Sequence, residues 1–355
     1  MNAGAETGHN IEKIYLGEVV MKFLSSAFAA LILSTSVVAA EPFRLIVTDL
    51  ETPLVPNSVM DLALQEGYFE REGVEVELVR VQQTPSALAA IQANEGDMAN
   101  IGTDALLLLV ANGADDLKAV VSPNKSLPFL IAGKEEIASP ADLAGKSFGI
   151  GRPGSIDHSL STRVLQKYDV DVSKIDMVAL GQPNQRAQAL VAGQIDATTM
   201  SIGTWAAMPD TTGLHVLISQ DDYYKAAPVV SKVNIVTAKA LEERRDDVKK
   251  VIAALIKASR DFASDPNVWV EAMVKARPDV EKATLESLGE AFQQSWSVNG
   301  GLSKDELEYT TTALYEGGDF ANVRKVELSE WADFSVIDEV LAELGANESL
   351  DAVTR

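Results

Sequence analysis

Glycine, serine and lysine residues between positions 144 and 154 form three short motifs that occur in catalytic sites. The first, Gly149-Ile-Gly-Arg-Pro-Gly154, has the G-x-G-x-x-G spacing of dinucleotide-binding loops and lies between an expected strand and an expected helix. Such a site also needs an acidic residue at the end of the next strand, but Asp176 opens that strand, and Pro153 interrupts the turn. Nucleotide binding is therefore disfavoured.

The other two motifs share Gly145, Lys146 and Ser147. Gly145-Lys-Ser-Phe-Gly149 matches the G-x-S-x-G pattern of a nucleophile elbow, and residues 144–147 resemble the end of a phosphate-binding loop. Both sites need a helix directly after the motif, whereas Ser147 opens an expected strand. The phosphate loop also needs glycine where this chain has Pro140. We therefore predict no catalytic residue and do not expect an enzyme.

Residues that bind metals are too few for a convincing metal site. The chain contains no cysteine, and its three histidines are His9, His158 and His215. Residues 169–180 begin like a calcium loop, but they lack glycine at the sixth position and end on Leu180 where a glutamate belongs. We expect neither a metal nor a cofactor. The lack of cysteine also excludes disulfides, thiol chemistry and a lipid-modified cysteine anchor.

What remains is a set of residues at the carboxyl ends of expected strands, which is where open parallel sheets bind ligands. Gly154-Ser155 ends one strand and opens a helix, whose free backbone N–H groups and dipole can bind an anion or a polar group. Each residue alone could equally be a helix cap or a surface group, and their shared position is what favours a ligand site. The candidate ligand-binding residues are Thr48, Asp49, Leu50, Thr103, Asp104, Ser155, Ile156, Asp157, His158, Arg186, Ser201, Thr204 and Trp205.

Strand and helix patterns alternate from Phe43 onward, which is typical of mostly parallel sheets covered by helices. The expected strands are 43–47, 74–81, 97–101, 117–122, 147–150, 175–180, 195–201 and 214–219. The expected helices are 57–66, 85–93, 104–110, 155–168, 182–192, 246–263, 268–276, 280–296, 303–316 and 329–344. The extended apolar segments 123–133 and 229–237 are interpreted as two crossings between two αβ units.

This pattern predicts an α/β protein of two lobes. Lobe 1 comprises residues 41–123 and 236–355, including a C-terminal helical tail that packs back on it, and lobe 2 comprises residues 124–235. The hinge crossings are expected near 124–130 and 228–236. A second core is expected because the 315 residues after position 40 exceed what one core usually holds.

The first 40 residues are expected to lie outside the folded protein. Met21 to Ala40 has one cation, an apolar stretch and two terminal alanines, which is the order of a secretory signal peptide cleaved after Ala40. We expect Met21 to be the true start and residues 1–20 to be a disordered upstream extension. An exported protein without a cysteine anchor suggests a Gram-negative periplasm. The net charge of −22 argues against nucleic acids and anionic membranes as partners.

Three spaced elements carry a family resemblance. They are SPADLAGKSFGIGRPGS at 139–155, ALVAGQIDA at 189–197 and ALQEGYFEREGVEV at 63–76. Together they resemble the solute-binding proteins of ABC importers of the nitrate/sulfonate/taurine type, a group that includes binders of thiamine-precursor pyrimidines. The resemblance implies a periplasmic-binding-protein type 2 fold, with two αβ lobes joined by a two-segment hinge and a ligand in the cleft between them.

The resemblance also implies a function. We expect a monomeric, periplasmic substrate-binding component that delivers a small molecule to an ABC permease and ATPase in the inner membrane. A polar or zwitterionic organic ligand, such as a sulfonate, a taurine-like molecule, a pyrimidine or an aromatic acid, fits best. Asp49, Glu51, Asp104 and Asp157 would repel a purely anionic ligand unless they are paired or point away, and Arg186 could hold the acidic end of a zwitterion.

Two alternatives remain open. The chain could present its ligand-bound form to a membrane sensor instead of a transporter, which the sequence cannot distinguish. It could also be an enzyme like the pyrimidine synthases related to this fold. Those enzymes use a cysteine-rich segment, and this chain has no cysteine.

Overall fold

The computed structural model describes residues 41–124, 129–153, 155–316, 320–349, 351 and 353–355. Residues Met1–Glu41 form one unit and Pro42–Arg355 a second. The expected signal peptide and upstream extension lie outside the described residues.

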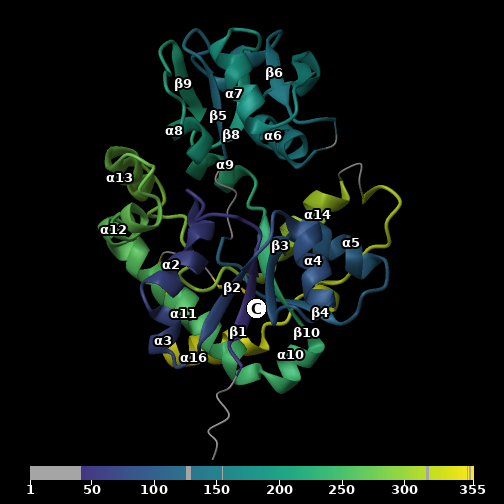
Figure 1. Ribbon diagram of the computed structural model, residues 1–355. Coiled ribbons are helices and arrows are strands. Elements are labelled where there is room, and N and C mark those ends of the chain that lie inside the picture. Colours follow the sequence, from purple (N-terminus) through teal and green to yellow (C-terminus); the bar gives the residue numbers. More distant parts are fainter. Residues whose placement is uncertain (1–40, 125–128, 154, 317–319, 350, 352) are drawn as a thin grey trace, which may run out of the picture. The chain divides into compact units, whose positions relative to one another are not determined.

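The first sheet, sheet A, has five strands in the order β2-β1-β3-β10-β4 (Figure 1). Strand β1 pairs in parallel with β2 and β3, whereas β10 runs antiparallel to both β3 and β4. Four of the five side chains of β1 are buried, as in a strand covered on both faces. The strands are β1 (Phe43–Val47), β2 (Val76–Arg80), β3 (Met98–Gly102), β4 (Leu117–Val121) and β10 (Lys232–Thr237).

The helices near sheet A come from both ends of the chain. Helix α11 contacts α2, α3 and α16, and it buries Val248, Val251, Ile252, Leu255 and Ile256 at helical spacing. These early and late helices therefore share one core. They are η1 (Pro56–Ser58), α2 (Val59–Gln65), α3 (Tyr68–Arg71), α4 (Thr84–Gln92), α5 (Thr103–Ala111), α10 (Ala238–Glu243), α11 (Arg245–Ser264), α12 (Pro266–Ala276), α13 (Lys282–Ala291), α14 (Lys304–Tyr315), α15 (Leu328–Trp331) and α16 (Ser335–Leu344).

Sheet B has five strands in the order β7-β6-β8-β5-β9 (Figure 1). Strand β6 pairs in parallel with β7 and β8, and β5 runs antiparallel to both β8 and β9. Its strands are β5 (Phe129–Lys134), β6 (Ser147–Ile150), β7 (Asp176–Ala179), β8 (Ala197–Ser201) and β9 (Leu214–Ile218). Its helices are η2 (Pro140–Leu143), α6 (Ile156–Lys167), η3 (Val172–Lys174), α7 (Pro183–Val191), α8 (Ile202–Ala206) and α9 (Gln220–Ala226).

The chain passes from sheet A to sheet B after β4 and returns to sheet A with β10. The two segments expected to be crossings thus each contribute an internal strand to a sheet, β10 to sheet A and β5 to sheet B. Only short stretches remain as connections. Segment 123–133 was expected to be a crossing, but its apolar end pairs with β8 and β9. Segment 229–237 was also expected to be a crossing, but it pairs with β3 and β4. The lobe boundaries and the hinge stay predictions.

Two expected helices are shorter than the sequence pattern indicates. The helix expected at 280–296 ends at Ala291, and a buried turn containing Trp296 follows it. The helix expected at 329–344 is broken into α15 and α16. The break occurs because Ala332 forms a parallel bridge with Ala119 of β4, and the Asp333 N–H donates to the Ala119 carbonyl at 2.9 Å.

Candidate ligand-binding site

The end of β1 carries a half-buried polar cluster around Lys232. The Lys232 Nζ donates to Thr48 Oγ1 at 2.9 Å and lies 3.8 Å from Asp49 Oδ2. Asp49 also accepts a hydrogen bond from Asn57 Nδ2 at 2.9 Å. Burial lowers the pKa of Lys232, while the neighbouring Asp49 carboxylate opposes that shift. The Asp49 carboxylate is therefore compensated by a cation inside the protein.

Lys232 is a candidate site residue that sequence reasoning missed. It opens β10, and the antiparallel register places it opposite Gly102 at the end of β3. A lysine directly before the extended run 233–236 was a usable signal. Because that run was interpreted as part of a crossing between two lobes, the sequence did not predict that Lys232 lies at the strand ends of sheet A.

At the end of β3, Thr103 and Asp104 differ in environment. Thr103 is buried, its N–H donates to the Ser231 carbonyl at 3.0 Å, and its Oγ1 has no hydrogen-bond partner among the described residues. Asp104 is exposed. Leu50, after β1, is also exposed, with 64% of its surface accessible. Thr103 thus has a buried hydroxyl that is unpaired within the described part of the chain, whereas Leu50 and Asp104 project to solvent.

Arg186 is the central residue at the strand ends of sheet B. Only 3% of it is exposed, and it donates to the Thr199 carbonyl at 3.0 Å and to the Gly181 carbonyl at 2.5 Å. Its NH1 lies 3.6 Å from Asp157 Oδ2. Burial lowers the pKa of the Arg186 guanidinium, and the Asp157 carboxylate opposes that shift. Arg186 therefore holds two carbonyls and one carboxylate in place.

Asp157 and Ser155 organise the loop between β6 and α6. The Gly151 N–H donates to Asp157 Oδ2 at 2.7 Å. The Ser155 hydroxyl donates to the Arg152 carbonyl at 2.6 Å and accepts from the Arg152 N–H at 3.3 Å. Its hydroxyl thus shapes the loop rather than capping the helix. His158 follows in α6 and is half-buried, and the structure describes no side chain for Ile156.

A cavity of about 340 Å³ lies at these loops and is here called the Arg186 cavity. It brings Ser155, Asp157 and Arg186 together, as the sequence predicted, and adds neighbours from the loop between β7 and α7. Its lining residues are Phe129, Gly151, Arg152, Ser155, Asp157, Gly181, Gln182, Pro183 and Arg186.

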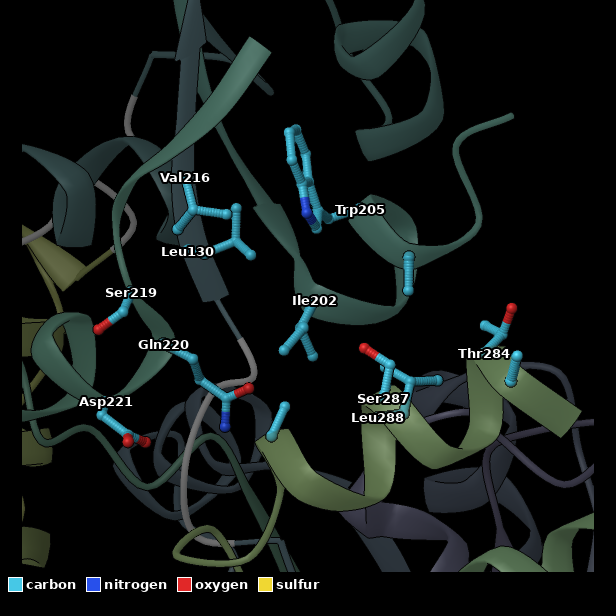
Figure 2. A pocket seen from close by; sticks show the side chains of 13 residues that line it. Leu130, Ile202, Trp205, Val216, Ser219, Gln220, Asp221, Thr284, Ser287 and Leu288 are labelled. Carbon is cyan, nitrogen blue, oxygen red and sulfur yellow. The ribbon is translucent and has the colours of Figure 1, made fainter. Parts of the chain in front are cut away.

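Ser201, the last residue of β8, lies elsewhere, together with Thr204 and Trp205 of α8. The Ser201 Oγ accepts from the Thr204 N–H at 3.0 Å and so caps this short helix. Trp205 lines a different cavity, of about 570 Å³, together with residues of α13 (Figure 2). The loop after β1 reaches the start of α8, because a methyl group placed on Gly203 would lie 3.3 Å from the Leu54 carbonyl oxygen.

Ser147, which two of the motifs that suggested catalysis share, has a structural role. The Ser147 hydroxyl donates to Asp196 Oδ2 at 2.9 Å, at the start of β6 and away from the Arg186 cavity. Within the described residues, no cluster of three or more His, Cys, Asp or Glu side chains could hold a metal ion. No helix in the same part of the chain is long and apolar enough to span a membrane.

Comparison with known proteins identifies both the family and the fold. The family model described as NMT1/THI5 like matches residues 59–268. A curated protein of Brucella abortus that is named a binding protein is 26% identical over 267 residues, which cover 70% of this chain and 79% of the relative.

Solved structures show the same fold. The periplasmic aliphatic sulphonate binding protein SsuA of Escherichia coli is 18% identical with a TM-score of 0.64, and the match covers 82% of this chain and 92% of SsuA. An SsuA from Methylobacillus flagellatus is 15% identical with a TM-score of 0.67, and the match covers 89% of this chain and 98% of that SsuA. The prediction of a two-sheet α/β fold of the periplasmic-binding-protein type is therefore confirmed.

Proposed function

Since the chain belongs to the NMT1/THI5-like family, we propose that it is the substrate-binding component of an ABC importer. The protein is a binding protein rather than an enzyme, as are the curated and structural relatives described above. In the proposed cycle it captures a small polar or zwitterionic organic molecule and delivers it to a permease and ATPase in the membrane.

The Arg186 cavity is the observation that carries this proposal. Its volume of about 340 Å³ lies at the lower end of the range for small-molecule sites. It lies at the carboxyl ends of β6 and β7, where open sheets bind ligands. The buried guanidinium favours a ligand with an anionic or strongly polar end. Thr48, Thr103 and Lys232 would provide polar contacts from sheet A.

The pairing of the acidic residues refines the ligand class. Asp49 is compensated by Lys232, Asp157 by Arg186, and Glu51 lies 3.7 Å from Arg277 NH2. Because three of the four carboxylates are paired with cations, they repel an anionic ligand less strongly than four unpaired carboxylates would. We propose a zwitterion with a sulfonate or carboxylate end, such as a taurine-like molecule, as the first class to test, with pyrimidines and aromatic acids next.

Export to a periplasm is part of the same proposal. It is supported by the signal-peptide pattern at 21–40 and by the similarity to two SsuA proteins that are named as periplasmic. A monomer would suffice for this role, because one chain supplies both sheets.

The test is a thermal-shift screen of the chain from Glu41 onward against taurine and related zwitterions, alkylsulfonates, pyrimidines, aromatic carboxylates and nitrate. We expect a shift of several degrees that is confined to one chemical class, because a ligand that binds only the folded state stabilises it by RT ln(1 + [L]/Kd). No shift with any class would count against an importer for these ligands.

The Asp104→Asn variant then reports the charge of the ligand end near sheet A. If the ligand carries a cation there, its affinity should fall by about 1–3 kcal/mol, as for a lost charged hydrogen bond. Unchanged binding would show that the exposed Asp104 does not contact the ligand, and tighter binding would show that an anionic end lies near it.

A further inference from the structure

The cavity of about 570 Å³ beside Trp205, here called the Trp205 cavity, shares no lining residue with the Arg186 cavity. It is lined by α8, the start of β5, the middle of β9, the start of α9, and one face of α13 (Figure 2). Nothing in the proposed importer cycle uses it. Its size and composition make it a site in its own right.

One side of the Trp205 cavity is apolar. Trp205, Ile202, Leu130 and Val216 form this wall, and Leu288 of α13 lies opposite them (Figure 2). Val216 leaves 37% of its surface exposed, and Trp205 is only half-buried, whereas the other three tryptophans of the chain are buried. A flat apolar molecule on this wall would remove apolar surface from water, and an indole face is well suited to stacking.

The floor of the Trp205 cavity contains an unpaired acceptor. Gln220 is 95% buried, and its Nε2 donates to the Ser295 hydroxyl, which fixes the amide. Its Oε1 has no hydrogen-bond partner in the part of the chain that the structure describes, and Figure 2 shows this oxygen turned toward Ile202 and Ser287. Buried acceptors are normally satisfied, so this oxygen calls for a donor from a bound molecule or a water.

The charge of the lining residues limits what can bind. Among the described residues that line the Trp205 cavity, Asp221 is the one charged side chain, and no lysine or arginine takes part. A sulfonate or carboxylate would therefore meet only a carboxylate of like sign, unlike in the Arg186 cavity, where a guanidinium is present.

We propose that the Trp205 cavity is a second ligand site, for a small flat aromatic molecule without negative charge that donates one hydrogen bond to Gln220 Oε1. The ring stacks on Trp205 and fills the space between the apolar wall and α13. Ser287 and Thr284 form a polar rim that can hold water around the ligand's edge.

Indole, a neutral ring with one N–H donor, is the probe, and calorimetric titration of the full chain is the measurement. We expect one saturable site for indole and about tenfold weaker binding of 1-methylindole, which cannot donate. Indole-3-acetate, which adds a negative charge, should also bind more weakly. Equal binding of indole and 1-methylindole, or no saturable binding up to the solubility limit of indole, would overturn the proposal.

Two variants on α13 locate the site. Ser287 lines the Trp205 cavity, whereas its exposed neighbour Glu286 does not. Ser287→Trp should fill the space and abolish indole binding, and Glu286→Trp should leave it unchanged. Binding that survives Ser287→Trp would place indole elsewhere. The hit from the importer screen should still bind Ser287→Trp, so failure of one proposal is distinguishable from failure of the other.

The Gln220→Leu variant tests the hydrogen bond itself. Leucine keeps the apolar bulk but offers no acceptor, so indole and 1-methylindole should then bind equally. A preference for indole that persists in Gln220→Leu would exclude Gln220 as the acceptor. If this variant does not fold, the pair of α13 variants still decides where indole binds.

Discussion

At the scale of single residues, the proposed site is built from charges that the protein itself compensates. Asp157 accepts from the Gly151 N–H and faces Arg186, and Asp49 is held by Asn57 and Lys232. Such pairs keep charged groups buried without requiring a ligand. The site can therefore exist without a bound ligand.

Arg186→Met should destabilise the fold by about 3 kcal/mol, because it leaves Asp157 and the carbonyls of Gly181 and Thr199 without their buried donor. Urea unfolding at neutral pH measures the change. Arg245→Met is the matched control, since Arg245 pairs with Glu339 at the surface, where such pairs contribute about 0–1 kcal/mol. Equal effects of the two variants would contradict a structural role for Arg186.

The same residue shows the limit of sequence reasoning at this scale. The sequence suggested that Arg186 could hold the acidic end of a ligand. In the structure its guanidinium already binds two backbone carbonyls and lies 3.6 Å from Asp157, which lines the same cavity, so its charge is partly compensated there. The direction of the Arg186 side chain depends on the carbonyls of Thr199 in β8 and of Gly181 in the loop between β7 and α7. The local sequence pattern around Arg186 does not reveal these contacts.

At the scale of secondary-structure elements, side chains at strand starts fix the register of sheet B. Asp196, directly before β8, accepts from Lys134 Nζ of β5 at 2.8 Å and from the N–H and hydroxyl of Ser147 of β6, both at 2.9 Å. One carboxylate thus joins three neighbouring strands at the end opposite the Arg186 cavity.

Stability should therefore depend on Asp196 at acidic pH. Burial raises its pKa, but the hydrogen bonds from Lys134 and Ser147 dominate and lower it to about 2. Because the pKa is lower in the folded state, the stabilisation is complete above the ordinary value near 3.8 and is lost between about pH 4 and pH 2. With 22% of the side chain exposed, we expect about 1–2 kcal/mol.

The measurement is urea unfolding of the wild type and of Asp196→Asn at pH 5 and at pH 2.5. The stability difference between the two proteins should shrink at the lower pH. A difference that stays constant over this range would show that the Asp196 carboxylate does not titrate in this window. Lys134→Met, which removes the first of the stabilising donors, should reduce the pH-dependent part in the same direction.

A second element-scale prediction concerns α14, which joins the tail to the segment that leads back into β10. Thr310 is buried, and its Oγ1 accepts from the Val230 N–H at 2.9 Å. Thr310→Val should cost about 1–3 kcal/mol, because it leaves that buried N–H unpaired. Thr312→Val, on the exposed face of the same helix, should change stability by less than about 0.5 kcal/mol.

The urea concentration at the unfolding midpoint, compared at equal m-values, measures the stability of both valine variants. A Thr310→Val midpoint as high as that of Thr312→Val would mean that Val230 finds another acceptor. The comparison is well matched, since both threonine hydroxyls also donate to a carbonyl four residues earlier, Glu306 or Glu308.

At the scale of the whole molecule, the alternation of strands and helices predicted two αβ sheets but not their pairing. Most strands were located to within two residues because their apolar patterns are local. The two antiparallel internal strands, β5 and β10, were interpreted as crossings. Strand order depends on pairing with strands distant in sequence, which a local pattern does not show. The error hid Lys232 from the candidate site and left the Trp205 cavity unforeseen.

The two proposed sites lead to a prediction for the whole molecule, because ligands at separate sites stabilise one folding equilibrium additively. At one hundred times its Kd, the best hit of the importer screen should add about 2.7 kcal/mol, and indole at the same ratio should add as much. Together they should add about 5.4 kcal/mol if the Arg186 and Trp205 cavities bind independently. A shared site would give only about 3.1 kcal/mol. Unfolding with both ligands present therefore separates two sites from one, whatever the identity of the transported molecule.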